Sequence, residues 1–156
     1  MCTWRQLRFL LVSCFLAGCA HVPESRVSLD GSQITDLTKV ALIEEDKSHP
    51  ALLRGLDGVE LDSMRIPNAF GQYVYVVSAG RHALWVTDMP YGHPLIPQRR
   101  RCYTIRADLS KGVRYRLKED ANMKKALLVR TDTGETVSTG ELVDEPWVFS
   151  RPCKWQ

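Results

Sequence analysis

The chain has 156 residues, of which 44% are hydrophobic, and it carries 21 Lys and Arg residues against 18 Asp and Glu residues. This length suffices for one domain with a single core. The net charge of +3 is too small to indicate nucleic acid or another polyanion as the partner. The sequence also lacks the serine-hydrolase elbow, the zinc motif H-E-x-x-H, the Walker loop and G-x-G-x-x-G, so the enzyme classes built on these motifs gain no support.

A short apolar run lies near the N-terminus. Arg5 and Arg8 precede it, and Phe9–Ala17 is roughly half of the about 20 apolar residues that a membrane-spanning helix needs. Basic residues, a short apolar core and small residues at its end are typical of a cleaved signal peptide. The run ends in Leu16-Ala17-Gly18-Cys19, which resembles the lipobox of bacterial lipoproteins. An ordinary secretory signal that happens to contain a cysteine here is the alternative.

The lipobox resemblance implies that residues 1–18 are removed and that Cys19 carries a covalent diacylglycerol and an N-acyl chain, with no other cofactor. Each buried CH₂ contributes ~0.8 kcal/mol, so two or three acyl chains hold a protein on a membrane where one is marginal. Ala20, in place of an aspartate, implies sorting to the outer membrane of a Gram-negative host, facing the periplasm. Removing 18 of the 156 residues, two of them basic and none acidic, leaves 138 residues with a net charge of +1.

Residues 19–39 are polar and show no lasting periodicity, so we expect a lipidated flexible tether there and a folded domain over residues 40–156. Val40–Ile43 is a short apolar run that predicts the first strand of this domain. Within Leu52–Leu61, the dipeptide Asp57-Gly58 tolerates the positive φ angles of a type I′ turn and therefore predicts a hairpin.

The clearest strand signal lies in Tyr73–Thr87, where two alternating segments flank Ala79-Gly80. A two-residue turn there predicts a hairpin whose successive side chains lie on opposite faces. One face would carry Tyr73, Tyr75, Val77, His82, Leu84 and Val86, and the other would carry Val74, Val76, Ala83 and Trp85. Because both faces are apolar, we expect this hairpin to be central or to cover a partner-binding surface.

A second pair of alternating segments follows the Gly- and Pro-rich residues 89–98. A turn at Asp108–Gly112 would place on one face Tyr103, Ile105, Ala107, Val113, Tyr115 and Leu117, and on the other Cys102, Thr104, Arg106, Arg114, Arg116 and Lys118. We therefore expect a half-buried antiparallel hairpin with a basic outer surface. Ala126–Arg130 and Thr136–Thr139 predict a third hairpin around Asp132-Thr133-Gly134.

Short strands with frequent turn signals predict an all-β fold, an antiparallel β-sandwich or small barrel of about 7 strands. Val77–Val86 resembles the Gly-x-His-x-Leu-x-Val hairpin of PEGA-like surface domains, with Gly80 and His82 at the matching places. It is also similar to a hairpin of small proteobacterial lipoproteins in which a Gly-x-x-Tyr-x-Leu strand follows. Here that strand is Gly112–Leu117, without the usual small residue before it. The resemblance implies a β-rich envelope domain and carries no known active site.

The cysteines predict one disulfide. Two of the five would leave with the signal segment and Cys19 would carry lipid, so Cys102 and Cys153 remain. In an oxidising compartment such a pair indicates a disulfide, and two free thiols are the alternative. Closing this loop would stabilise the fold by roughly 4 kcal/mol. The bond would hold the C-terminal segment, with Trp147 and Trp155, across the basic face.

Clustered cations are the most suggestive feature for binding. They include Arg99 and Arg100, and the candidate binding surface consists of Arg101, Arg106, Arg114, Arg116 and Lys118. Each cation near an anionic surface contributes ~1 kcal/mol, so lipid headgroups, an anionic glycolipid or an acidic envelope protein are the candidate partners. A solvated sheet face balanced by nearby carboxylates is the alternative.

Neither a metal site nor a catalytic group is indicated. The four histidines do not lie at paired ligand spacing. We expect His82 to be a hydrogen-bonded core side chain, whereas His93 lies beside Tyr91 in a loop where it could contact a ligand. Adjacent carboxylates such as Glu119-Asp120 are more typical of solvated turns than of an acid–base pair.

Together these features predict a non-enzymatic, membrane-anchored envelope lipoprotein that acts as a binding or assembly-accessory module. Two other classes stay open. One is a periplasmic hydrolase with its site near His93. The other is an inhibitor of a secreted enzyme such as lysozyme, which would present a loop of the disulfide-closed domain.

Overall fold

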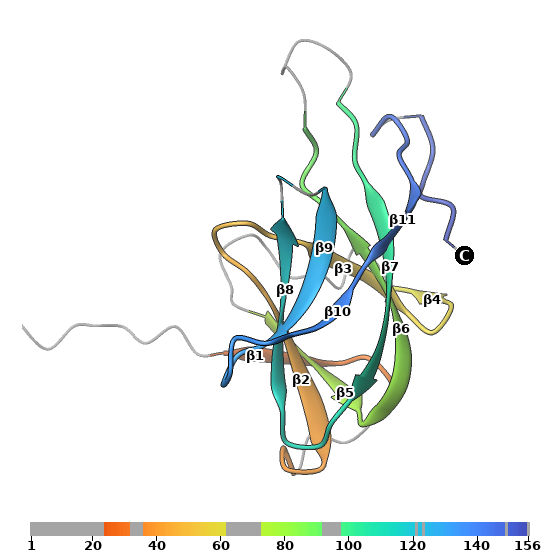
Figure 1. Ribbon diagram of the computed structural model, residues 1–156. Coiled ribbons are helices and arrows are strands. Elements are labelled where there is room, and N and C mark those ends of the chain that lie inside the picture. The colour runs from red at the N-terminus through yellow and green to blue at the C-terminus, as the bar shows by residue number, and fades with distance from the viewer. Residues whose placement is uncertain are drawn as a thin grey trace, which may run out of the picture.

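The computed structural model describes residues 24–31, 36–61, 73–91, 98–120, 122, 124–148 and 150–155. In this part of the chain eleven strands form two packed sheets (Figure 1). The predicted all-β sandwich is confirmed, as an open sandwich rather than a barrel and with more strands than the sequence indicates. The described residues include no apolar helix long enough to span a membrane.

The six-stranded sheet consists, in spatial order, of β1 (Ser25–Ser28), β5 (Tyr73–Ser78), β2 (Val40–Glu45), β8 (Arg114–Asp120), β9 (Lys125–Arg130) and β10 (Thr136–Thr139). The five-stranded sheet consists of β11 (Glu141–Asp144), β7 (Cys102–Leu109), β6 (Gly80–Thr87), β3 (Leu52–Leu56) and β4 (Val59–Glu60). The β1–β5 and β2–β8 pairs are parallel, so the expectation of a purely antiparallel sandwich is wrong there. Parallel neighbours need a long connection, and the chain between β2 and β8 passes through the other sheet.

The chain changes sheets at two places where the sequence predicts hairpins. β5 pairs with β1 and β2, whereas β6 pairs with β3 and β7. Ala79 and Gly80 therefore form a corner between the two sheets, and Gly80 has a φ of 136° that side chains rarely allow. In the same way β7 lies in the five-stranded sheet and β8 in the six-stranded sheet. Both predicted hairpins are wrong, because each pair of strands continues across the core instead of pairing edge to edge.

The buried faces of these strands nevertheless agree with the alternation. The core between the sheets contains Tyr75, Val77, Leu84, Val86, Tyr103, Ile105, Tyr115 and Leu117. A second, smaller cluster on the outer face of the six-stranded sheet contains Val40, Leu42, Val74 and Val76, with Leu37 packed against it. Full burial of one such side chain stabilises the fold by about 1.5–3 kcal/mol.

Two shorter hairpins form as the sequence predicts. Asp57 and Gly58 have φ angles of 49° and 87° and connect β3 to β4. The connection from β9 to β10 contains Gly134, with a φ of 73°. In both cases the residues that tolerate positive φ stand where the turn requires it.

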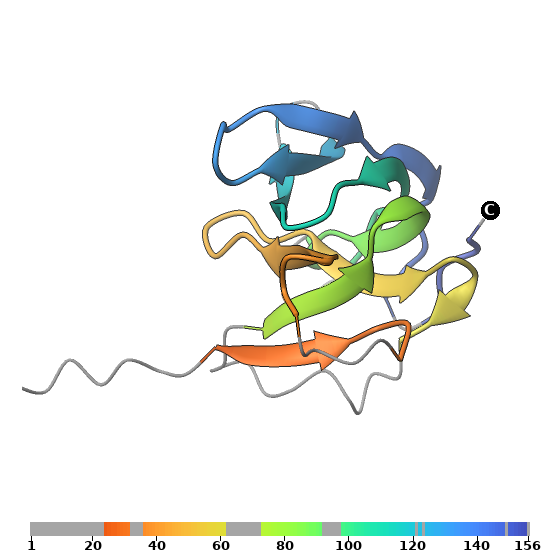
Figure 2. The same cartoon turned by 90° about the horizontal axis from the view of Figure 1, so that it is seen from below.

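Part of the range expected to be a tether is folded. β1 pairs with β5 at the edge of the sandwich (Figure 2), and Val27 and Leu29 pack against the core. Just before β1, both carboxylate oxygens of Glu24 accept hydrogen bonds of 3.0–3.2 Å from Arg114 on β8. The folded domain thus includes Glu24, well before residue 40. The pairing with β5, two apolar side chains and one ion pair hold this strand, which is too short to show a periodicity.

The C-terminal segment docks on the outer face of the five-stranded sheet. A disulfide joins Cys102 on β7 to Cys153, which confirms the predicted pair. The rings of Trp85 and Trp155 stack with centroids 5.3 Å apart and planes inclined by 7°. Gly55 on β3 makes room for this stack, since a Cβ there would lie 2.5 Å from the Trp85 ring.

Candidate functional site

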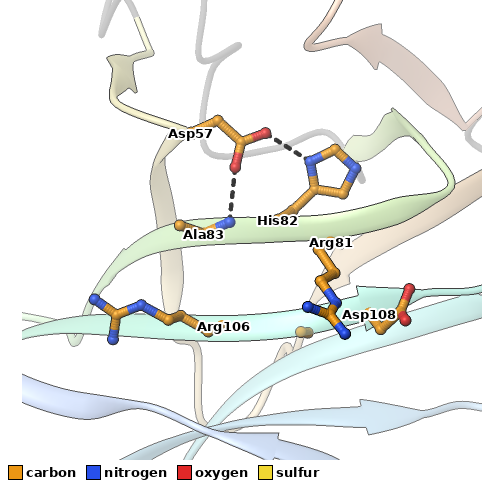
Figure 3. A pocket seen from close by; sticks show the side chains of 7 residues that line it. Asp57, Arg81, His82, Ala83, Arg106 and Asp108 are labelled. Atoms are coloured by element: carbon orange, nitrogen blue, oxygen red, sulfur yellow. Dashed lines mark hydrogen bonds and ion pairs between the residues drawn. The ribbon is translucent and has the colours of Figure 1, made fainter.

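A shallow hollow of about 530 Å³ opens on the five-stranded sheet (Figure 3). Its lining comes from the β3–β4 turn, β6 and β7, and consists of Asp57, Arg81, His82, Ala83, Arg106, Ala107 and Asp108. Ala83 is small and lies opposite Arg106, so it leaves room beside the longer charged side chains, whereas Ala107 packs against the core. β6 and β7 are paired over their whole length, so the backbone beneath the hollow is held by a continuous ladder of hydrogen bonds.

A hydrogen-bonded pair, Asp57 and His82, forms one side of the hollow. Asp57 contacts the Nδ1 atom of His82 at 2.6 Å, and its other oxygen accepts a 2.7 Å hydrogen bond from the backbone N–H of Ala83. The Nε2 atom of His82 lies 3.0 Å from the carbonyl oxygen of Ser78. Both partners of the ring are hydrogen-bond acceptors, so a ring nitrogen that carries a proton donates to the one it faces. The expected hydrogen bonds of His82 are therefore confirmed, but its side chain lines the hollow and does not belong to the core. The pair connects the β3–β4 turn to β6.

Two exposed arginines project from neighbouring strands of the hollow. In the β6–β7 register Arg81 lies opposite Asp108, and Ala83 lies opposite Arg106. Figure 3 shows Arg81 turned toward Asp108 and Arg106 extended the other way along β7. Arg106 meets Glu141 at 3.3 Å, but both side chains are more than half exposed, so this pair contributes little. No partner of Arg81 is found among the described residues. The hollow thus offers donors and acceptors to a polar ligand.

The candidate surface predicted from the sequence is divided between the two sheets. Arg106 lies on the outer face of the five-stranded sheet, while Arg114, Arg116 and Lys118 alternate along β8 on the outer face of the other. The five residues therefore do not form one surface. The alternation that places them on one face of a hairpin is real, but the corner after β7 sends the two strands to opposite sides.

The three residues on β8 stay together, and two of them are ion-paired. Arg114 bridges Glu24 and Glu44, and Arg116 contacts Glu44 at 2.6 Å. The hydrogen bonds from Arg114 hold the pKa of Glu24 below its ordinary value. The alternative of a solvated sheet face whose cations are balanced by nearby carboxylates therefore describes Arg114 and Arg116. Their side chains are one-third and nearly one-half exposed.

Arg101, the fifth residue of the candidate surface, lies at the end of the sandwich and is mostly buried. Its guanidinium group lies 2.8 Å from Glu119 and 3.4 Å from Asp88, and it stacks on the ring of Tyr91. Burial raises the pKa of Asp88 to about 6, although the backbone N–H of Arg101 donates a 2.6 Å hydrogen bond to it. Arg101 is therefore part of an internal ion-pair network and is not available to an external ligand.

The remaining sequence predictions divide between described and undescribed residues. Cys19 and the lipobox lie outside the described residues, as does His93 with its loop. The hollow itself was not predicted. Asp57 and His82 are far apart in sequence, and Arg81 carries no signal of its own, so only the register of β3, β6 and β7 brings them together.

Comparison with known proteins assigns neither a family nor a function to this chain. No protein-family model matches this chain, and the comparisons with curated proteins and with solved structures find no match either. Its function is therefore inferred from its own residues and fold.

Proposed function

We propose that this protein is a membrane-anchored envelope lipoprotein, acylated on Cys19, whose β-sandwich acts as a non-enzymatic binding or assembly-accessory module. The observation that carries the proposal is the Cys102–Cys153 disulfide, which fastens the C-terminal segment to the sheet. Disulfides persist outside the cytoplasm, which is also where the lipobox would deliver the chain. Two unrelated features, one at each end of the protein, thus point to the same compartment.

The hollow on the five-stranded sheet supports binding of a polar ligand. Arg81, Arg106 and Asp108 are exposed on two strands that are paired over their whole length, so the backbone that carries them needs no ordering when a ligand binds. The carboxylate of Asp57 is already held by His82 and the Ala83 N–H. These groups suit the holding of a ligand better than the transfer of a proton, because both ring nitrogens of His82 already lie against acceptors, Asp57 and the carbonyl oxygen of Ser78. An envelope protein with exposed polar groups would fit this arrangement, and an anionic glycolipid is the alternative if the hollow faces a bilayer.

The outer membrane, on its periplasmic side, is the proposed location. Ala20 after the acylated cysteine favours release from the inner membrane in a Gram-negative host. The disulfide requires an oxidising compartment, and the periplasm supplies one.

Metabolic labelling with a palmitate analogue tests the anchor. We expect the wild-type chain to be labelled and to fractionate with membranes, and Cys19→Ala to lose the label and the membrane association. Cys14→Ala, which removes another thiol of the N-terminal segment, is the matched control and should behave like the wild type. An unlabelled wild-type protein would refute the proposal.

Crosslinking in intact cells tests the binding role. We expect Arg81→Glu to lose specific crosslinked partners that the wild type retains. Lys47→Glu makes the same charge change on an exposed residue after β2, away from the hollow, and serves as the control. An identical set of partners in the wild type and in Arg81→Glu would exclude the hollow as the site.

A further inference from the structure

The chain between the proposed anchor and the folded domain is very short. Glu24 lies five residues after Cys19 and is fixed to β8 by its hydrogen bonds with Arg114. An extended chain spans at most about 3.6 Å per residue, so these five residues reach about 18 Å. If Cys19 is acylated, the start of β1 therefore stays close to the headgroups of the bilayer, and the domain cannot turn freely on a long tether.

The face next to this attachment carries an excess of positive charge. On the described strands themselves, the outer side of β1, β2, β8 and β9, together with Glu24, holds five cations and three carboxylates, a net charge of +2. Asp36 and Lys39, next to Leu37 on the same face, pair with each other and leave this net charge unchanged. The cations are Arg26, Arg114, Arg116, Lys118 and Lys125, and the carboxylates are Glu24, Glu44 and Asp120. The side chains of Arg26 and Arg116 are 39% and 46% exposed. Phosphate groups of lipids complement such a surface.

We propose that this outer face of the six-stranded sheet is the membrane-facing surface of the protein and rests on the phosphates of the bilayer in which Cys19 is anchored. The inference rests on the proposed lipid anchor and names the orientation that the anchor imposes. A net charge of +2 would hold a free protein only weakly. A short tether keeps the effective concentration of the surface high, so a weak attraction is enough to orient the domain.

The orientation has a consequence for the rest of the molecule. The hollow and the tryptophan stack lie on the five-stranded sheet, which is the opposite side of the sandwich. With the six-stranded sheet against the bilayer, Arg81 and Arg106 point away from the membrane. They are then accessible to a ligand in the surrounding space.

Lysine acetylation read by mass spectrometry tests the orientation on the full, acylated protein. The protein is compared in detergent micelles and in vesicles of phosphatidylethanolamine and phosphatidylglycerol. We expect acetylation of Lys118 and Lys125 to fall several-fold in the vesicles. Lys154, which belongs to the C-terminal segment on the other sheet, is the internal control and should be labelled equally in both.

Charge variants separate the role of the surface from that of the anchor. Arg116→Glu/Lys125→Glu should lose the protection of Lys118 while keeping the palmitate label and the native circular dichroism spectrum. Arg81→Glu/Lys154→Glu makes the same charge change on the opposite sheet and should keep the protection. A long Gly/Ser insertion after Ala20 should also abolish the protection, because it lowers the effective concentration.

The outcomes distinguish this inference from the proposed function. A labelled, vesicle-bound protein with equal acetylation of Lys118, Lys125 and Lys154 relative to micelles would overturn the orientation and leave the anchor intact. Protection that survives in Arg116→Glu/Lys125→Glu would likewise overturn the assignment to these cations. Absence of the palmitate label on the wild-type chain would instead overturn the anchor itself.

Discussion

Asp57 joins two segments of the five-stranded sheet with a single side chain. Its oxygens hold His82 and the backbone of Ala83, and its own φ of 49° starts the β3–β4 turn. A hydrogen bond to a charged group contributes about 1.5–3 kcal/mol, so we expect Asp57→Ala to lower the free energy of unfolding by about 2 kcal/mol in urea denaturation. Asp57→Asn keeps an acceptor and tolerates positive φ, so it should lose less. Equal losses in the two variants would contradict this role.

Asp88 should make the stability depend on pH. Its exposed fraction is 2%, and burial raises its pKa from 3.8 to about 6. The folded state therefore binds more protons than the unfolded state between these values. The stabilising contribution is complete below pH 3.8 and is lost as the pH rises through about 6.

Asp88→Asn measures this contribution. The shift in pKa corresponds to at most about 3 kcal/mol, and the variant, which cannot ionise at this position, should lack that part of the fall in stability between pH 4 and 6. Urea denaturation at several pH values gives the comparison. Curves that run parallel for the wild type and the variant would show that Asp88 does not titrate in this range.

At the scale of the strands, the sequence reveals which side chains are buried but not which strands pair. Tyr75, Val77, Leu84 and Val86 all face the core, as the alternation predicts. A hairpin within one sheet and a corner between two sheets leave the same alternation, because in both cases one side of each strand faces the core. The turn residues Ala79 and Gly80 suit either arrangement.

The predicted basic surface is wrong for the same reason, because it depends on which strands pair. Arg106 and Arg114 lie on one face only if β7 and β8 form a hairpin, and the corner between them places them on opposite sides of the sandwich. Short-range features are more predictable. The Asp57-Gly58 turn is set by residues adjacent in sequence, and the Cys102–Cys153 bond by the number of cysteines left over. Contacts such as that of Asp57 with His82 depend on strand order, which one sequence does not specify.

The docked C-terminal segment should contribute a substantial part of the free energy of unfolding. The disulfide joins residues 51 positions apart, and the chain-entropy relation gives roughly 4 kcal/mol for a loop of this size. We expect Cys102→Ser/Cys153→Ser to lose up to that amount in thermal denaturation and to change the tryptophan fluorescence, because Trp155 is released from Trp85.

Trp155→Ala separates the two contacts of this segment. It keeps the disulfide and removes the stack, so its fluorescence should change while most of the stability remains. If the double serine variant melted at the same temperature as the wild type, the segment would contribute little, and the entropic account of this disulfide would be wrong.

For the whole molecule, the two ends of the described chain are attached to different sheets of the sandwich. The N-terminal end enters along β1 beside the charged face of the six-stranded sheet, and the C-terminal end is bonded to the five-stranded sheet. A lipid at Cys19 would therefore act on one face only. In the proposed orientation, the hollow on the other face would stay accessible to a partner that approaches from the surrounding space.

The start of the folded domain can be tested by truncation. Two soluble chains, one beginning at Glu24 and one at Val40, differ in whether they contain β1, the Glu24–Arg114 ion pair and Leu37. Without β1 the edge of β5 is unpaired and the apolar side chains Val74 and Val76 lose part of their cover. An uncovered edge strand is prone to pair with another chain.

We expect the chain from Glu24 to be monomeric and cooperatively folded in size-exclusion chromatography and thermal denaturation. The chain from Val40 should aggregate or lose about 3 kcal/mol, because it lacks the three partly buried side chains Val27, Leu29 and Leu37, and full burial of one such side chain contributes about 1.5–3 kcal/mol. Equal melting temperatures and monomeric behaviour of both chains would show that residues 24–39 contribute nothing to the folded domain and act as a flexible tether, as the sequence predicts. The reach from Cys19 to the domain would then be long, and the orientation of the domain at the membrane would no longer be constrained by it.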